Sequence, residues 1–161
     1  MKYDRTINSD ILMMASGKSD HGPIEACIEL LDAIYQSGSI ALVLDEEGKI
    51  EQEYKEKLGF DAHCYSSVFV SRMLTEKGKL NTVKRASHRE WSAIERKLRE
   101  TCLHAQDRYF VRVAMSSKSA VVVAEEKHFC DATVCKILSK AVKVESQKAE
   151  IALECVKAIV R

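Results

Sequence analysis

Residues 105–129, AQDRYFVRVAMSSKSAVVVAEEKHF, place acidic residues around a helix pattern and an apolar run. Asp107 stands at the start of a segment with helical spacing, and the apolar run AVVVA covers residues 120–124. Glu125 and Glu126 follow that run directly. A short continuous apolar run is typical of a strand that is covered on both faces. The stretch therefore predicts a helix and then a buried strand, with one carboxylate where the helix begins and two where the strand ends.

The same alternation of helices and buried strands extends over the rest of the chain. IALVL at residues 40–44 is a second apolar run, and the segment KIEQEYKEKLG that follows the turn has helical spacing. Shorter strands are predicted near residues 2–7 and 142–145. Short apolar strands that alternate with helices are typical of an open parallel sheet with helices on both faces. The predicted fold class is therefore α/β, a three-layer α/β/α arrangement around a small parallel sheet.

Several helices carry start and stop signals. Ser19 or Asp20 can cap a helix that has Pro23 in its first turn and Gly38 at its end. SHRE, residues 87–90, is a capping-box pattern, because the serine and the glutamate can each bind the other's backbone amide. Further helices are predicted at about residues 61–76, 105–116, 131–141 and 147–160. No repeat or low-complexity linker interrupts this order, which indicates one domain spanning residues 1–161.

The composition is that of an ordinary globular domain. The chain has 161 residues, of which 46% are hydrophobic and 30% are charged, so it is long enough to bury a core. No apolar run approaches the roughly 18 residues that a membrane span needs. The first ten residues, MKYDRTINSD, lack the apolar core of a secretion signal. We therefore expect a cytoplasmic protein that is not a membrane protein.

The six cysteines are expected to be free thiols, because disulfides are rare in a reducing compartment. Cys102 with His104, and His128 with Cys130 and Cys135, form two local clusters, but neither has the paired C-x-x-C spacing of a structural zinc site. The sequence also has no phosphate-binding glycine loop and no nucleophile elbow. The carboxylates near the strand ends are the remaining candidates for chemistry.

Asp10, Glu53 and the pair Glu125/Glu126 each follow closely on a predicted strand, and Asp107 starts the helix that leads into one. Ligands of parallel sheets bind beyond the carboxyl ends of the strands, so these acids can converge on one edge. Neighbouring carboxylates repel one another unless a cation neutralises them, and oxygen ligands suit Mg²⁺ or Mn²⁺. The alternative is that each acid is a helix cap or a surface charge.

The charge distribution offers a second pattern. Residues 25–56 are strongly acidic and residues 76–99 are strongly basic, although the net charge is only +1. Such an asymmetry is consistent with a metal site beside a surface that binds a polyanion. On charge alone, two solvated helix faces of opposite sign are the preferred explanation.

Three stretches resemble the PIN-domain nucleases, a family of metal-dependent enzymes with a small parallel α/β fold. QDRYFVRVAMSSKSAVVVAEEKHF is similar to the family's segment of an aspartate, a short helix, a buried strand and a further acid followed by an aromatic residue. IALVLDEEGKIEQEYKEKL resembles its strand and helix with a Glu-Tyr pair, here Glu53-Tyr54, and INSDILMMA resembles the end of its first strand. The resemblance extends from about residue 4 to residue 155.

The resemblance implies a set of site residues. It assigns metal binding and catalysis to Asp10, Glu53, Asp107 and Glu126, with Asn8 as an accessory oxygen ligand. Glu126 stands where the family usually has an aspartate. The family's first motif is Asp, any residue, Asn, whereas this chain has Asn8-Ser9-Asp10, with the two polar residues exchanged. The implied cofactor is Mg²⁺ or Mn²⁺.

The implied function is endonucleolytic cleavage of single-stranded RNA, in a toxin or a defence component. The expected partners are single-stranded RNA and a cognate inhibitor protein. Whether the chain forms a homodimer is left open by the sequence. Phosphates would be bound by four basic residues, Lys84, Arg85, Arg89 and Arg96. The alternative is a PIN-like fold without catalysis that binds a nucleic acid or a protein. A receiver-like signalling domain, suggested by Asp45, is disfavoured because AVVVAEE supplies no lysine at the strand end.

Overall fold

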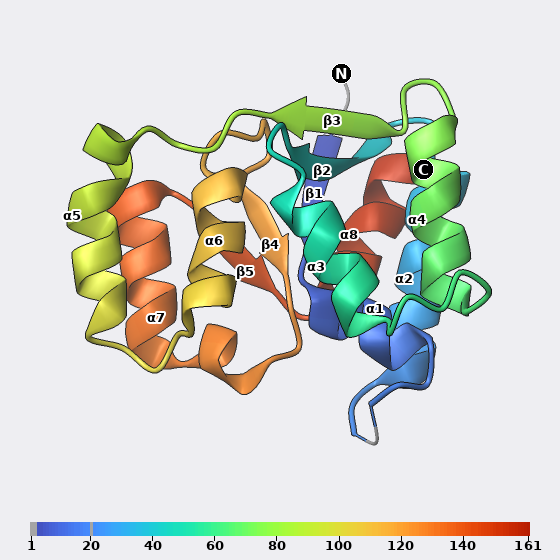
Figure 1. Ribbon diagram of the computed structural model, residues 1–161, viewed down its shortest axis with the longest axis horizontal. Helices are drawn as coiled ribbons and strands as arrows, with labels where there is room; N and C mark the ends of the chain where they lie inside the picture. The colour runs from blue at the N-terminus through green and yellow to red at the C-terminus, as the bar shows by residue number, and fades with distance from the viewer. Residues whose placement is uncertain (1–2, 20) are drawn as a thin grey trace.

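The computed structural model describes residues 3–19 and 21–161. In this part of the chain five parallel strands form one sheet in the order β3-β2-β1-β4-β5 (Figure 1). The strands are β1 (Tyr3–Ile7), β2 (Ile40–Asp45), β3 (Leu80–Val83), β4 (Val121–Val123) and β5 (Glu145–Gln147). The predicted parallel sheet is confirmed. The last strand lies at Glu145–Gln147, slightly later than the predicted 142–145.

Helices cover both faces of the sheet. They are α1 (Ser9–Ala15), α2 (Ile24–Gln36), α3 (Lys49–Lys57), α4 (Tyr65–Thr75), α5 (His88–Arg99), α6 (Ala105–Ala114), α7 (Ala132–Ile137) and α8 (Ala149–Val160), with a 3-10 turn η1 (Lys127–Cys130) and a π turn η2 (Leu138–Val142). Figure 1 shows α3 and α6 in front of the sheet and α2 and α8 behind it. The three-layer α/β/α fold class is therefore confirmed.

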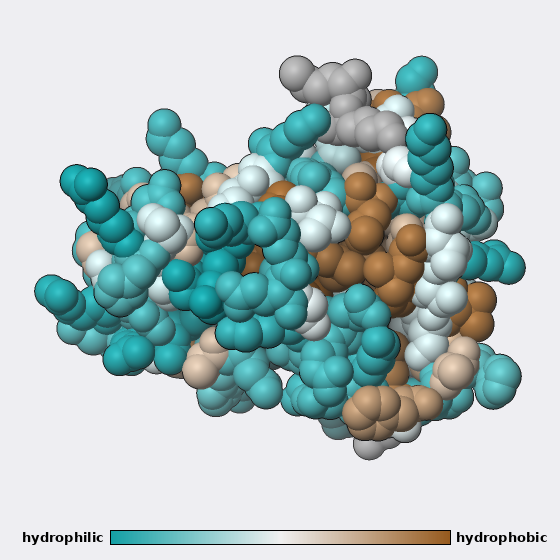
Figure 2. Space-filling model, turned by 45° about the horizontal axis from the view of Figure 1, so that its top comes forward, coloured by the Kyte–Doolittle hydropathy of each residue, from teal (hydrophilic) through white to brown (hydrophobic). Residues whose placement is uncertain are grey.

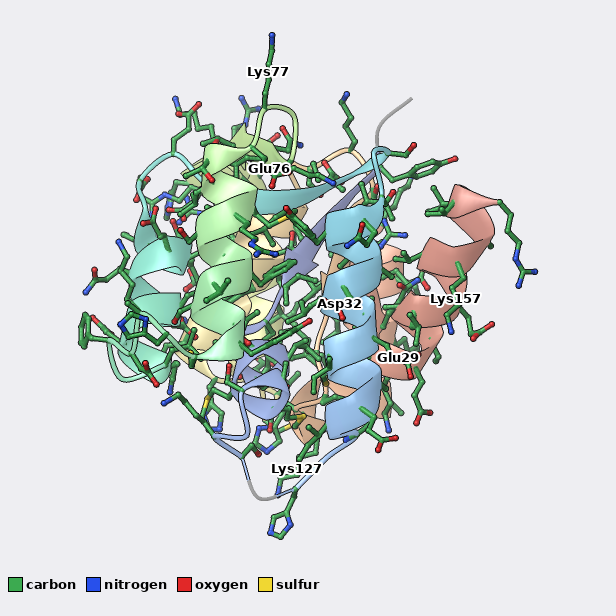
Figure 3. All side chains as sticks on the ribbon, turned by 90° about the vertical axis from the view of Figure 1, so that its right-hand side faces the viewer. Glu29, Asp32, Glu76, Lys77, Lys127 and Lys157 are labelled. Atoms are coloured by element: carbon green, nitrogen blue, oxygen red, sulfur yellow. The ribbon has the colours of Figure 1, made fainter. Side chains whose placement is uncertain are left out.

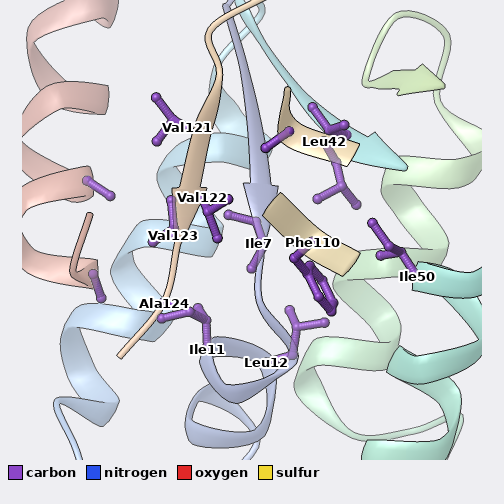
Figure 4. Packing of buried hydrophobic residues seen from close by; sticks show 14 of the residues in the cluster. Ile7, Ile11, Leu12, Leu42, Ile50, Phe110, Val121, Val122, Val123 and Ala124 are labelled. Carbon is purple, nitrogen blue, oxygen red and sulfur yellow. The ribbon is translucent and has the colours of Figure 1, made fainter. Parts of the chain in front are cut away.

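The core lies on both sides of β1 and β4. Ile7, Val122 and Val123 have no exposed surface, and Figure 4 shows them packed beside Ile11 and Leu12 of α1. In front of the sheet, the ring of Phe110 on α6 packs near the ring of Tyr54 on α3, with the two ring centroids 6.2 Å apart. Each fully buried side chain of this kind stabilises the fold by about 1.5 to 3 kcal/mol. The apolar runs of the sequence thus become the buried centre of the sheet.

Strand β3 was not predicted. Its sequence, LNTV, is short, and its side chains are only partly buried or exposed. A four-residue edge strand with an asparagine and a threonine has no strong local preference for extended structure. It forms because its backbone pairs with β2 from Leu42↔Leu80 to Asp45↔Val83. This pairing is a tertiary contact, which local sequence patterns do not reveal.

The predicted helix starts have mixed outcomes. The capping box of α5 is confirmed, since the Ser87 side chain accepts from the amide of Glu90, and the Glu90 carboxylate accepts from the amide of Ser87. Helix α2 begins one residue after Pro23, and the hydroxyl of Ser19 donates to the carbonyl of His21 and does not cap this helix. The other predicted cap, Asp20, lies outside the described residues.

All six cysteines, each within the described residues, are free thiols, as expected. Within residues 3–19 and 21–161, no helix combines the length and the apolar character that crossing a membrane requires.

The side chain of Asp4 connects three segments at the amino end of the sheet. Its carboxylate accepts hydrogen bonds from the amide of Ser119 (2.7 Å), the amide of Lys118 (2.9 Å) and Nδ2 of Asn81 (2.6 Å). Asp4 is buried, and burial by itself raises the pKa of a carboxyl, yet these hydrogen bonds bring the pKa of Asp4 below its ordinary value. The charged form of Asp4 therefore stabilises the folded state.

We predict that Asp4→Asn lowers the free energy of unfolding by about 2 to 4 kcal/mol near neutral pH, because three donors around a buried side chain lose a charged acceptor. Since the folded-state pKa of Asp4 is depressed, its contribution is present above the ordinary aspartate pKa of 3.8 and is lost as the pH falls through the folded value. Urea unfolding at neutral and acid pH measures both effects.

The control for Asp4→Asn is Asp131→Asn. Asp131 is exposed and caps α7 by accepting from the amides of Thr133 and Val134, and asparagine caps helices about as well as aspartate. This variant should stay within about 0.5 kcal/mol of the parent. Equal losses of unfolding free energy in the two variants would show that Asp4 contributes no more to stability than an exposed helix cap.

Candidate metal centre

Asn8 and Ser9, directly after β1, connect two of the predicted site carboxylates. Nδ2 of Asn8 donates to Oδ1 of Asp107 (3.0 Å), and the hydroxyl of Ser9 donates to Oε1 of Glu53 (2.8 Å). The same hydroxyl lies 3.3 Å from Oδ1 of Asn8. A continuous polar chain therefore runs from Glu53 of α3 through Ser9 and Asn8 to Asp107 of α6, at the carboxyl end of the central strand.

Buried contacts nearby hold the elements that carry this chain. The buried hydroxyl of Tyr54 donates to the carbonyl of Ile7 (2.5 Å), which fixes α3 against the last residue of β1. The side chain of Asn8 accepts from the amide of Asp10 and so caps α1, which Figure 1 shows beginning below the end of β1. Glu53 and Asp107 thus reach the end of β1 from two helices whose neighbouring residues are buried in the core.

Both carboxylates of the chain lie in an environment that disfavours their charge. Burial raises the pKa of Glu53 and the pKa of Asp107, although the hydrogen bonds from Ser9 and Asn8 act in the opposite direction. The charge of Asp107 raises the pKa of Glu53 further, so the two groups interact. Their raised pKa values indicate carboxylates that a nearby cation would stabilise.

Asp10 has a different role in this arrangement. Its Oδ2 accepts from the backbone amides of Glu125 (2.8 Å) and Glu126, and its Oδ1 accepts from the amide of Ile11 (2.7 Å). Asp10 therefore connects the start of α1 to the segment that follows β4. Burial raises the pKa of Asp10 to about 7, the three amide hydrogen bonds oppose that shift, and Asp107 adds to it.

The two glutamates after β4 point in different directions. Oε1 of Glu125 accepts from the amide of Ala149 (2.7 Å), at the start of α8. Oε2 of Glu126 accepts from the amide of His128 (2.8 Å), and its Oε1 lies 3.2 Å from Nδ1 of the same histidine. Glu126 caps η1, and its negative charge also raises the pKa of Asp107. Of the two, Glu126 is the one whose charge acts on Asp107.

Two histidines near Asp107 were not predicted as site residues. The rings of His104 and His128 meet edge to face, with centroids 4.9 Å apart, and both act to lower the pKa of Asp107. Ser9 was also missed, although it stands inside the INSD stretch between two residues that were named. The histidines lie 24 positions apart in the sequence, so no local spacing connects them.

The residues of the centre fit a cation only in part. Among residues 3–19 and 21–161 no three side chains of histidine, cysteine, aspartate or glutamate are grouped so that they could together hold a metal ion. Glu53 and Asp107, however, each keep a second carboxylate oxygen that has no hydrogen bond within the described chain. Mg²⁺ is commonly held by one or two carboxylates, several waters and a substrate phosphate. Glu53 and Asp107 therefore suit a two-carboxylate site.

Helix α3 separates two hollows of different character. On the side of Glu53, a hollow of about 470 Å³ is lined by Glu47, Gly48, Lys49, Gln52, Glu53, Glu56 and Gln106. On the other side, a hollow of about 450 Å³ lies between α3 and α4, and its walls include Leu58, Val70 and Leu74. The second hollow coincides with the brown area in Figure 2. Of the residues of the candidate centre, Glu53 lines the polar hollow.

The predicted RNA-binding residues are not equivalent. Lys84, Arg89 and Arg96 are exposed, and no carboxylate of the described residues pairs with them. Arg85 is only partly exposed, because its Nε lies 2.7 Å from Oε1 of Glu47 and its guanidinium lies 5.9 Å from the ring centre of Tyr109. Glu47 also lines the polar hollow. Arg85 therefore connects the basic segment to the rim of the candidate centre.

Comparison of the sequence with protein-family models and with curated proteins gives no match.

We predict that Asp10→Asn flattens the pH dependence of stability in metal-free buffer. Because the folded-state pKa of Asp10 is raised, its contribution is complete below the ordinary value of 3.8 and is lost as the pH rises to about 7. Between pH 5 and pH 7, the free energy of unfolding of the variant should therefore rise relative to that of the parent, by at most about 1.4 kcal/mol per pH unit. Urea unfolding at pH 5, 6, 7 and 8 measures this difference. Parallel profiles for parent and variant would contradict the assignment.

Proposed function

We propose that the protein is a metal-dependent endoribonuclease of the PIN type that cleaves single-stranded RNA. The observation that carries the proposal is the hydrogen-bonded chain of Glu53, Ser9, Asn8 and Asp107 at the carboxyl end of β1. Ligands of parallel sheets bind at this edge. The raised pKa values of the two acids favour a cation between them and the substrate phosphate.

The residues of the candidate centre have different roles in the proposed reaction. Glu53 and Asp107 hold the cation, while Asn8 and Ser9 keep one oxygen of each acid fixed so that the other oxygen faces the ion. Asp10 positions α1 against the end of β4, and Glu126 with His128 borders the centre. Bound there, Mg²⁺ or Mn²⁺ would activate water and stabilise the charge that develops on the phosphate.

A group of exposed basic residues supports a polyanionic substrate. Three of the seven residues that line the polar hollow are glutamates, so a phosphate chain would approach over the basic segment. Lys84 and Arg89 lie on or next to the start of α5, Arg96 lies in its last turns, and all three are exposed. Exposed cations without a carboxylate partner are available for phosphates, and such contacts give a strongly salt-dependent affinity.

The second candidate function is a PIN-like module that binds a nucleic acid or a protein without cleaving it. Two observations favour it: the described residues contain no three-ligand group, and both oxygens of Asp10 are occupied by backbone amides. The first candidate function also includes a toxin or defence role, a cognate inhibitor protein and a homodimer, which are part of the same proposal.

We predict that millimolar Mn²⁺ raises the melting temperature of the parent by about 3 °C or more, because it binds the folded state only. Asp107→Asn keeps an acceptor for Asn8 but removes one charge, so without metal it should be at least as stable as the parent. It should gain less from Mn²⁺ and cleave single-stranded RNA about 100-fold more slowly or not at all. Thermal melts and a gel assay on a fluorescent oligoribonucleotide measure these outcomes.

The matched control for Asp107→Asn is Glu29→Gln. Glu29 is exposed on α2, where its carboxylate lies 3.7 Å from Nζ of Lys157 on α8, and Figure 3 shows both residues on that side of the molecule. A surface pair of this kind contributes little to stability. This variant should respond to Mn²⁺ as the parent does. If Mn²⁺ leaves the parent unchanged and no RNA is cut, the catalytic function is excluded and the binding module is favoured.

We predict that Arg89→Glu combined with Arg96→Glu weakens binding to many single-stranded RNA sequences alike. The slope of log K against log salt should become shallower by about one unit for each phosphate that the variant no longer binds. Arg85 is left intact, because a glutamate there would face Glu47 and disturb the rim of the hollow. Filter binding at several salt concentrations measures both quantities.

The control for the arginine variants is Lys77→Glu. Lys77 is exposed in the turn between α4 and β3 and is labelled at the edge of the molecule in Figure 3. It should leave the affinity for RNA almost unchanged. A loss as large as that of the arginine variants would indicate an effect of net charge and not of a defined surface.

A further inference from the structure

The guanidinium of Arg5 is a buried charge that forms no ion pair with a carboxylate of the described residues. Arg5 lies in the middle of β1 and is only 5% exposed. Its Nη1 donates to the carbonyl of Asp4 (2.8 Å), and its Nε has no hydrogen-bond partner in the part of the chain that the structure describes. A buried charge of this kind is costly unless an anion and further hydrogen bonds compensate for it.

A cavity of about 520 Å³ adjoins this side chain. It is lined by Tyr3, Arg5, Lys118, Ser119, Val121, Glu145, Gln147 and Ile159. These residues come from β1, the segment before β4, β4 itself, β5 and the last turn of α8. Binding sites for small molecules commonly have volumes of about 300 to 1,000 Å³, with apolar walls and a few convergent polar groups. This cavity has both properties.

Gln147 supplies a second unpartnered polar atom in the same cavity. It is 6% exposed, and among residues 3–19 and 21–161 its Oε1 has no hydrogen-bond partner. Its Nε2 donates to Oε1 of Glu145 (2.8 Å) and contacts Sγ of Cys155 (3.7 Å). The Gln147 amide therefore hydrogen-bonds the carboxylate of Glu145, and Oε1 of Gln147 remains available as an acceptor. Buried polar atoms without partners are rare in folded proteins, so two beside one cavity call for an explanation.

We propose that this cavity binds a small molecule with an oxyanion head, a carboxylate or a phosphate, and a short apolar body. The planar fork of a guanidinium matches the oxygens of such a head, and Nε of Arg5 is one of the two donors that this geometry uses. Lys118 adds a second positive charge at the same cavity. Val121 and Ile159 contact the apolar body, and a hydroxyl or amine of the ligand donates to Oε1 of Gln147.

This site is separate from the proposed catalytic centre. Arg5 lies in the middle of β1, and Lys118 and Ser119 precede β4, whereas Asn8, Glu53 and Asp107 lie at the carboxyl end of β1. Both sites nevertheless depend on β1, because Arg5 and Asn8 are only three residues apart. Occupation of the cavity neutralises a buried charge on the central strand and so stabilises the whole sheet.

The test compares three sodium salts at equal ionic strength: inorganic phosphate, hexanoate and chloride. Melting temperatures are measured for the full chain in each salt, and isothermal titration calorimetry is performed with the salt that has the larger effect. At about 10 mM, phosphate, hexanoate or both should raise the melting temperature by about 2 °C or more above the value in chloride. A shift with hexanoate alone assigns a carboxylate head, and a shift with phosphate alone assigns a phosphate head.

Arg5→Met should abolish the shift and should be at least as stable as the parent in chloride, since it removes an unpaired buried charge at similar volume. Arg99→Met on α5, exposed and far from the cavity, is the control and should keep the shift. Ile159→Trp fills the cavity without altering Arg5 and should also lose the shift, which keeps the test decisive if the Arg5 variant does not fold. The proposal is overturned if neither salt exceeds chloride, or if either cavity variant keeps the full shift.

Discussion

The central strand β1 must satisfy its backbone on both edges while both of its faces are covered. It pairs in parallel with β2 through Tyr3, Asp4 and Arg5, and with β4 through Thr6 and Ile7. All four residues after Tyr3 are buried. Because a parallel sheet places all strand ends of one kind at one edge, the position of β1 decides which side chains meet there. The polar residues on and after β1 take their environment from this constraint.

Four of those polar residues show three different solutions to burial. Asp4 is charged and surrounded by three donors, so it anchors the amino end of the sheet. Asn8 and Ser9 are neutral and distribute hydrogen bonds between two acids. Arg5 is charged and has a single hydrogen bond to a backbone carbonyl. The protein's own groups account for the burial of Asp4 and for the burial of Asn8 and Ser9. The burial of Arg5 is the basis for proposing a ligand.

The exchanged order of Asn8 and Asp10 also has a structural meaning. The amide at position 8 lies between Ser9 and Asp107, where a third carboxylate would add repulsion to two acids whose pKa values are already raised. The carboxylate at position 10 instead accepts three backbone amides and connects α1 to the end of β4. The charge that the metal-binding proposal needs is therefore concentrated on Glu53 and Asp107.

The sequence by itself determined the α/β class, the parallel sheet and most of its helices, because long apolar runs and helical periodicity are local properties of the chain. It also led to the prediction that Asp10, Glu53, Asp107 and Glu126 can converge on one edge, since strand ends of a parallel sheet meet there. Only the tertiary structure decided that β3 exists, that Ser9 joins the two acids and that His104 touches His128. These features arise from contacts between residues far apart in the chain, and no local pattern encodes which atoms face one another. The same holds for Arg5, whose position in a buried strand can be predicted but whose missing partner cannot.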